Sequence, residues 1–391
     1  MEQRETEADE TLGEADPARI GIARALGLGV AAAVLGAGVG FAIWALLSSA
    51  YWLTDIVWTG ARGMLGEPAF SLFPLIACTT GGLFIGLWNA RFRSAPKPLD
   101  EVMAEVRAKG GYSVGRIAPS AVSFLLPIAF GGSVGPEAGL TGLVAAGCTW
   151  VGAKLRRLAG VEGAFSLRQK IPLYALGVAG GVAGVAAFGA LLGGGMPIPH
   201  FDAAPLSWEA AAWCVPLALV GWAMAVLYGL AVRASRHLAA TLGDRPVLKP
   251  LLCGIALGAV ALALPYVLFP GTQQASDLAA SWTGMEAAGL FATGLIKLAF
   301  IALCLNLGWS GGPFFPLIFC GVSVGFGFAA TLGAPAELAV AVVTSALIGG
   351  FTRKPAMTAL IMLLCFPVQD LPWLAVAIAV GAFLPQPSTR L

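Results

Sequence analysis

Two glycine-rich segments share the pattern G-G-x-x-x-P, which could build an anion site from backbone groups. The first motif runs from Gly131 to Pro136 and the second motif from Gly311 to Pro316. In each motif an apolar run leads into the glycines and another apolar run follows the proline. Proline is favoured at the first position of a helix because its missing N–H would have no partner there. Each motif is therefore predicted to be a helix start.

Helix N-termini present N–H donors and the positive end of the helix dipole. Two of them facing one point could hold an anion without a cationic side chain. Within a bilayer such irregular backbone is tolerated where it lines a protein or water cavity. Pro313 has no N–H and removes one possible donor from the second motif. The expected anion-binding residues are Gly132, Ser133, Val134, Gly135, Gly312, Phe314 and Phe315.

Two charged side chains, Glu137 and Lys297, lie in apolar stretches. Glu137 falls in the first turn after Pro136, where the helix dipole stabilises a carboxylate by about 0.3–1 kcal/mol. It could have this structural role, or it could be a gate or proton group that competes with the anion. Lys297 could attract anions over a long range, or form a structural pair with Asp277 or Glu286.

The composition is that of a helical membrane protein with many spans. The 391 residues are 58% apolar and 11% charged, with a mean hydropathy of +0.83. Residues 1–17 are rich in acidic side chains and are predicted to be a disordered acidic tail. Most basic residues fall in short loops between apolar runs, where they set topology, so binding to nucleic acid is not expected.

The chemistry of cysteine and histidine adds little to this sequence. The seven cysteines lie in apolar stretches without a C-x-x-C pair and are predicted to be buried free thiols. The two histidines, His200 and His237, are far apart. We therefore expect no metal, no cofactor and no enzymatic activity.

Apolar runs predict helices that are arranged as two halves. The first half spans residues 18–199 and the second half residues 200–391, and each contains one motif. Such a scheme is typical of transporters with internal repeats and broken helices. Residues 271–274 are predicted to form a turn. The predicted helices cover residues 20–49, 72–89, 100–109, 117–130, 136–151, 171–192, 210–232, 251–269, 285–307, 316–332, 336–347, 355–366 and 371–384.

The motifs resemble those of the CLC family of chloride channels and proton-coupled chloride transporters. The segment from Gly132 to Pro136 is similar to the family signature G-[KR]-E-G-P, and the segment from Ser310 to Pro316 is similar to S-G-G-x-F-x-P. Lys297 and the segment Arg353-Lys354-Pro355 also look like family features. The resemblance implies an all-α polytopic fold with a CLC-like inverted repeat of two halves and re-entrant helices.

The chain departs from the family pattern at the residues that would handle protons. Val134 stands at the position of the gating glutamate, and Phe201 stands where the family has its internal proton glutamate. The family's first signature has only an imperfect counterpart around Ser94. Val134 could be an ordinary apolar residue at a helix start, or an uncharged plug or open gate.

The favoured hypothesis is conduction of a small anion, most simply chloride, by a channel or uniporter without proton coupling. One alternative is a secondary transporter of fluoride, nitrate or bicarbonate that uses Glu137 as its titrating group. The other is a CLC-derived membrane scaffold that does not transport. The resemblance also implies an integral protein of a bacterial inner membrane, in contact with lipid, with a cytoplasmic N-terminus and a possible homodimer.

Overall fold

The structure, a computed structural model, describes residues 22–61, 63, 71–92, 99–112, 117–160, 167–194 and 198–386. Within these ranges the chain forms helices and no β-strand. The all-α fold predicted from the sequence is therefore confirmed. The predicted acidic tail, residues 1–17, lies outside the described residues.

The chain folds into two compact units. Unit 1 consists of Met1–Ala42 and Ala146–Leu192, and unit 2 consists of Ile43–Ala145 and Gly193–Leu391. Helices α1 (Ile22–Asp55) and α5 (Glu137–Ala159) contribute residues to both units. The predicted repeat halves divide the chain at residue 199 by the order of its helices, whereas the two units are grouped by contacts. The division into halves therefore stays a prediction.

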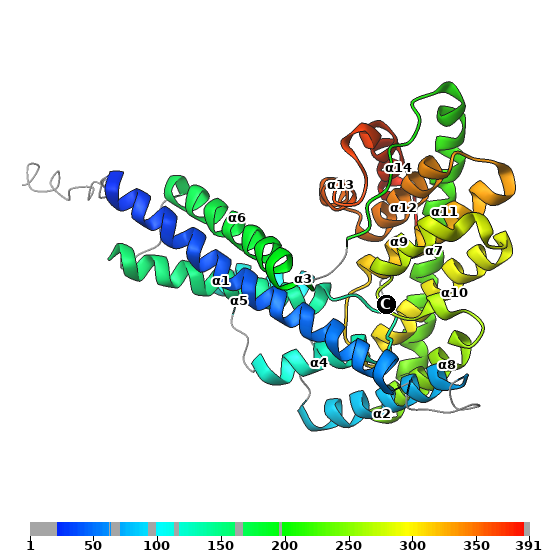
Figure 1. Cartoon of the computed structure of the whole chain (residues 1–391), viewed down its shortest axis with the longest axis horizontal. Coiled ribbons are helices and arrows are strands. Elements are labelled where there is room, and N and C mark those ends of the chain that lie inside the picture. The colour runs from blue at the N-terminus through cyan, green and yellow to red at the C-terminus, as the bar shows by residue number, and fades with distance from the viewer. Residues whose placement is uncertain are drawn as a thin grey trace, which may run out of the picture. The chain divides into compact units, whose positions relative to one another are not determined.

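Close contact between α1 and α6 (Leu167–Leu192) characterises unit 1, and the two helices run side by side in Figure 1. A Cβ atom added at Gly36 would meet the backbone of Gly177, and one added at Gly180 would meet the backbone of Ala33. Glycine allows two backbones to approach this closely, which is how helices often pack in membranes. Gly36 and Gly180 therefore lie at this contact.

The remaining helices belong to unit 2. They are α2 (Phe73–Phe92), α3 (Leu99–Lys109), α4 (Ile117–Ala129), α7 (Trp208–Thr241), α8 (Leu248–Ala261), α9 (Thr272–Ser281), α10 (Ala287–Asn306), α11 (Phe314–Leu332), α12 (Ala336–Thr352), α13 (Pro355–Met362) and α14 (Leu371–Phe383). Shorter turns are the π-helix Ile56–Ala61 and the 3-10 helices Pro265–Val267, Trp282–Gly284 and Val368–Asp370.

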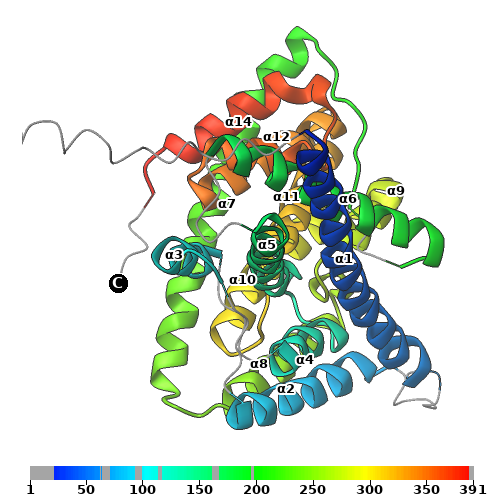
Figure 2. The same cartoon turned by 90° about the vertical axis from the view of Figure 1, so that its left-hand side faces the viewer.

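Helix α12 forms the centre of unit 2. Every residue from Leu338 to Gly350 is buried, which is expected of a helix that is apolar on all sides. It packs against α7, α11 and α14, and these helices lie around it in Figures 1 and 2. A second group of contacts joins α2 to α4 and α8. Both groups of helices include or adjoin the segments that contain the two motifs.

The structure differs from the sequence prediction around residues 251–281. A single helix was expected over residues 251–269, but α8 ends at Ala261 and is followed by the 3-10 helix at Pro265. Residues 271–274 were expected to be a turn, but they begin α9, whose N-cap is Gly271. Proline restricts the residue before it to extended backbone, which accounts for the break after α8.

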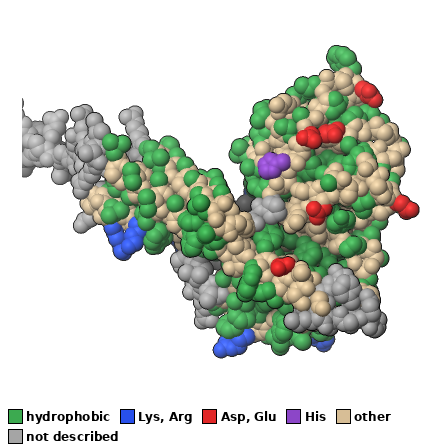
Figure 3. All heavy atoms as spheres, in the orientation of Figure 1, with side chains coloured by type: hydrophobic (Ala, Val, Ile, Leu, Met, Phe, Trp, Pro, Cys, Tyr) green, Lys and Arg blue, Asp and Glu red, His purple; other side chains and the backbone are tan. Residues whose placement is uncertain are grey.

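Seven helices in the described residues are long and apolar enough to cross a membrane, and four shorter apolar helices accompany them. Figure 3 shows hydrophobic side chains over most of the face drawn there, with few charged groups. Many large apolar side chains are exposed, including Val178 and Val182 on α6 and Leu360 on α13. Together with helices of this length and composition, such a surface is that of an integral membrane protein.

Candidate functional site

Both motifs are helix starts, as predicted. Helix α5 begins at Glu137, directly after Pro136, and α11 begins at Phe314, directly after Pro313. The preceding helices α4 and α10 end at Ala129 and Asn306. The first motif is therefore non-helical backbone between two helices, whereas the second motif is non-helical up to Pro313 and its last three residues, Phe314 to Pro316, already belong to α11.

The two motifs are joined by a reciprocal pair of backbone hydrogen bonds. The N–H of Gly135 donates to the carbonyl of Gly312 at 2.6 Å, and the N–H of Gly312 donates to the carbonyl of Gly135 at 2.8 Å. The two residues form an isolated antiparallel bridge. The helix starts thus lie directly against each other, although they are 177 residues apart in the chain (312 − 135).

Glycine is required at this contact because neighbouring atoms leave no room for a Cβ. At Gly311 a Cβ would lie 2.5 Å from the Cβ of Val134, and at Gly132 it would lie 2.7 Å from the ring of Trp309. Trp309 is fully buried, and its Nε1 donates to the carbonyl of Pro250 at 3.0 Å. This tryptophan therefore fixes the first motif against α8.

The carboxylate of Glu137 reaches from the first helix start to the second. Its Oε1 accepts a hydrogen bond of 2.6 Å from the N–H of Phe315, in the first turn of α11. Its Oε2 is shielded from solvent and has no hydrogen-bond partner in the described residues. One oxygen of the carboxylate therefore occupies a helix N-terminus, where a negative charge is favoured, and the other is unsatisfied.

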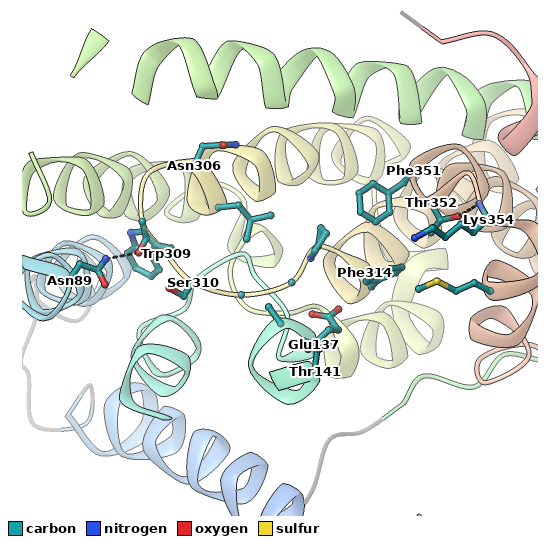
Figure 4. A pocket seen from close by; sticks show the side chains of 17 residues that line it. Asn89, Glu137, Thr141, Asn306, Trp309, Ser310, Phe314, Phe351, Thr352 and Lys354 are labelled. Atoms are coloured by element: carbon teal, nitrogen blue, oxygen red, sulfur yellow. Dashed lines mark hydrogen bonds between the residues drawn. The ribbon is translucent and has the colours of Figure 1, made fainter. Parts of the chain in front are cut away.

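A cavity of about 500 Å³ in unit 2 opens onto this carboxylate. Figure 4 shows Glu137 and Phe314 near the middle, with Lys354 and Thr352 towards one end and Asn89 and Ser310 towards the other. The lining residues are Asn89, Glu137, Ala138, Thr141, Leu305, Asn306, Gly308, Trp309, Ser310, Gly311, Gly312, Pro313, Phe314, Phe351, Thr352, Lys354 and Met357.

The backbone donors predicted to bind an anion divide into two groups. The N–H groups of Gly135 and Gly312 donate to each other's carbonyls, that of Gly132 donates to the carbonyl of Pro127, and that of Phe315 donates to Glu137. These four N–H groups are therefore paired with protein acceptors. The N–H groups of Ser133, Val134 and Phe314 donate to no group within the described residues.

Val134 does not line the cavity. Its side chain is fully buried in a hydrophobic cluster with Cys78, Leu257 and Trp309. Of the two interpretations drawn from the sequence, this contact favours an ordinary packing residue over a plug. Ser133 is also buried, and its hydroxyl has no partner in the described part of the chain.

Of the other positions singled out by the resemblance, Lys354 lines the cavity, whereas Phe201 and Lys297 do not. Phe201 packs its ring parallel to that of Phe366 at 5.0 Å, and its N–H donates to the carbonyl of Cys365. Ser94 lies outside the described residues. The predicted pairing of Lys297 with Asp277 or Glu286 is wrong, because its ammonium donates instead to four backbone carbonyls of residues 266–269.

Comparison with known proteins agrees with the fold and the motifs. The model of the voltage gated chloride channel family matches residues 191–386, just over half of the chain. The chain belongs to this family. The resemblance seen in the motifs is therefore confirmed, and so is a role in anion transport at the level of the family.

Solved structures of family members share the fold at low sequence identity. A fluoride/proton antiporter of the CLC type is 18% identical with a TM-score of 0.70, and the match covers 93% of this chain and 96% of that one. A eukaryotic CLC transporter is 16% identical with a TM-score of 0.67, covering 92% and 72%. A slow cyanobacterial Cl⁻/H⁺ antiporter is 15% identical with a TM-score of 0.66, covering 91% and 93%. No curated protein matches the chain by sequence.

Several lining residues of this CLC protein were missed by reasoning from the sequence. Asn89 donates to the carbonyl of Gly308 at 2.9 Å, and Trp309 holds Gly132 in place. Neither residue lies in a sequence motif that indicates a binding site. Thr141 could have been found, because it follows Glu137 by four residues and so shares its face of α5.

Proposed function

We propose that this CLC protein transports a small inorganic anion, with chloride as the first candidate, and that the Glu137 carboxylate gates the path. One observation supports this proposal. The carboxylate accepts the N–H of Phe315 at a helix start that faces a cavity. A carboxylate at such a position stands where a transported anion would bind, so the two would compete for one donor.

The unsatisfied Oε2 explains why the carboxylate could leave. A carboxylate has two oxygens that accept hydrogen bonds, and only Oε1 has a partner in the described residues. A buried charge that is only partly hydrogen-bonded is costly. Protonation would remove the charge, weaken the bond to Phe315 and allow an anion to take over the N–H. Anion flux should therefore rise as the pH falls.

This proposal favours Glu137 as a titrating gate over the uncoupled channel that the sequence alone suggested. Two of the solved structures with the same fold are described as antiporters of fluoride or chloride with protons. Coupling to protons is therefore the form of transport to test first. In the uncoupled alternative, Val134 leaves the path without a proton carrier and Glu137 serves only the helix start.

The test uses purified protein in liposomes loaded with chloride, fluoride, nitrate or bicarbonate, with efflux followed by electrode between pH 5 and 8. Glu137→Gln keeps the size of the side chain but cannot ionise. We expect wild-type flux to rise at low pH and the variant to conduct at a similar rate at every pH. Glu337→Gln is the matched control, since Glu337 also lies in the first turn of an apolar helix, α12, but does not line the cavity.

The direction of proton movement distinguishes the two forms of transport. With a chloride gradient and no initial pH gradient, an antiporter would drive protons uphill, whereas an uncoupled channel would not. Equal pH dependence in the wild type and in Glu137→Gln would show that Glu137 is not the gate. Absence of flux for every anion would favour the scaffold hypothesis.

A further inference from the structure

The ammonium of Lys297 lies inside a ring of backbone carbonyls. It is fully buried on α10 and donates to the carbonyls of Tyr266, Val267, Leu268 and Phe269 at 2.8, 3.3, 2.7 and 2.9 Å. An ammonium has three N–H donors, which the three shorter bonds use. Four carbonyl oxygens thus replace the water around a charge that would otherwise be too costly to bury.

The segment that supplies these carbonyls depends on the ammonium for its shape. Four successive carbonyls that converge on one point bring their negative ends together, which is unfavourable without a cation between them. The backbone reaches this arrangement through the 3-10 helix Pro265–Val267 and through Phe269, which has a φ of 63°. A positive φ is strained for a bulky residue and persists only where surrounding contacts hold it.

The same segment contacts the beginning of the first motif and the end of α4. The N–H of Phe269 donates to the carbonyl of Gly131 at 3.1 Å. The ring of Phe269 contacts the ring of Trp58 at 4.9 Å, and Nε1 of Trp58 donates to the carbonyl of Ala129 at 3.0 Å. Residues 129 and 131 are therefore anchored from the segment that Lys297 shapes.

Lys297 also contacts the helix that follows the second motif. Its ammonium lies 4.7 Å from the centre of the Phe319 ring, which is a cation–π contact. Phe319 follows Phe315 by four residues, so the two lie on the same face of α11. One side chain thus joins the approach to the first motif with the first turns of α11.

We propose that Lys297 is a positioning residue for the anion site. By gathering the carbonyls of residues 266–269 and packing on Phe319, it sets how the first motif and the start of α11 face each other, and so where the N–H of Phe315 points. Direct attraction of anions is less consistent with the geometry, because the carbonyls surround the charge with negative dipoles. The inference rests on the proposed transport function.

The experiment compares three variants of the full-length protein in detergent and in liposomes. Lys297→Met removes the charge, and Lys297→Arg keeps it on a planar group that cannot reproduce the carbonyl ring. Ser323→Ala is the matched control, because its buried hydroxyl donates from α11 to the carbonyl of Leu290 on α10 at 2.7 Å without touching residues 266–269. Chloride affinity is measured by calorimetry, thermal stability in detergent, and relative flux of chloride, nitrate and fluoride in liposomes.

We expect Lys297→Met to weaken chloride binding by about tenfold or more, as the loss of one well-placed hydrogen bond to a charged ligand would. Its order of preference among the anions should also change. The chloride affinity of Lys297→Arg should lie between that of Lys297→Met and that of the wild type. Ser323→Ala should lose thermal stability while keeping the affinity and the anion order of the wild type. If Lys297→Arg restores affinity completely, charge alone acts and the positioning role is overturned.

A second variant covers the case in which Lys297→Met does not fold. Trp58→Phe keeps an aromatic ring beside Phe269 and removes the hydrogen bond to Ala129, together with part of the indole contact with Gly131. We expect Trp58→Phe and Lys297→Arg each to weaken chloride binding more than Ser323→Ala does. If both variants keep the flux of the wild type and the chloride affinity of the control, the positioning role is overturned and the transport function stands. If the wild-type protein itself shows no anion flux, the transport function is refuted.

Discussion

A methyl group added at Gly312 would meet the carboxylate of Glu137, and the same holds at Gly135. At Gly135 the obstructing atoms all belong to the carboxylate end of this flexible side chain, and at Gly312 they also include the Cβ of Glu137 at 3.0 Å, so the Glu137 side chain has to shift. We expect Gly312→Ala to push the carboxylate away from the N–H of Phe315. Anion flux in liposomes should then become higher at neutral pH and less dependent on pH.

The control for this prediction is Gly289→Ala on α10, because no atom lies near the position of the added carbon. A double variant with Glu137→Ala provides a further check. If Gly312→Ala acts through the carboxylate, adding it to Glu137→Ala should have no additional effect on flux. An additive effect would mean that the methyl group disturbs the backbone pair instead.

At the level of single residues, the sequence predicted the parts of the site that follow from local backbone chemistry. Glycine before proline indicated the two helix starts, and the place of Glu137 in the first turn of a helix indicated a dipole contact. Its partner, Phe315, comes from a motif 178 residues further along the chain. Nothing in the local pattern of either motif shows that the two starts are bonded to each other, so this contact required the structure.

Among the helices, the contact of α1 with α6 gives the clearest test of packing. Gly36 faces the backbone of Gly177, whereas two residues further along α1 Gly38 has no atom within 4 Å of an added Cβ. Gly36→Ala should destabilise the protein by about 1–3 kcal/mol through overpacking. Gly38→Ala should be neutral or stabilising by up to about 1 kcal/mol, because alanine favours helix more than glycine does.

Thermal unfolding of the two variants in the same detergent checks this prediction. Equal melting temperatures would mean that α1 and α6 are not in close contact. Gly36 and Gly40 of the first span lie at a helix contact, but Gly38 does not. The partner helix could not be predicted, because small residues occur in several spans and their pattern alone does not indicate which two helices meet.

The break between α8 and α9 shows where prediction of the elements fails. An apolar run over residues 251–269 is typical of one helix, but its last part forms the carbonyl ring around Lys297. That conformation is set by a side chain on α10 and not by the local sequence. Tertiary contacts therefore override the local pattern here.

Across the whole molecule, the cysteines allow burial to be tested by chemistry. All seven are free, as predicted; Cys148 is half-buried and the other six are buried. The thiolate is the reactive form, and a buried thiol in apolar surroundings reacts slowly. In detergent, N-ethylmaleimide should modify Cys148 first and the other six only after unfolding. Intact mass measured over time counts the modified thiols, and rapid reaction of several cysteines in the folded protein would contradict this packing.

The bridge between Gly135 and Gly312 affects which residues of this site can be substituted. A bond between two peptide groups involves no side chain, so drift at neighbouring positions can proceed without breaking it. Only the residues that permit the close approach are constrained, and these are small ones. A fold shared at 15–18% identity is compatible with a contact that constrains so few side chains. The side chain of Glu137 can therefore move or be replaced while the joined backbones stay in place.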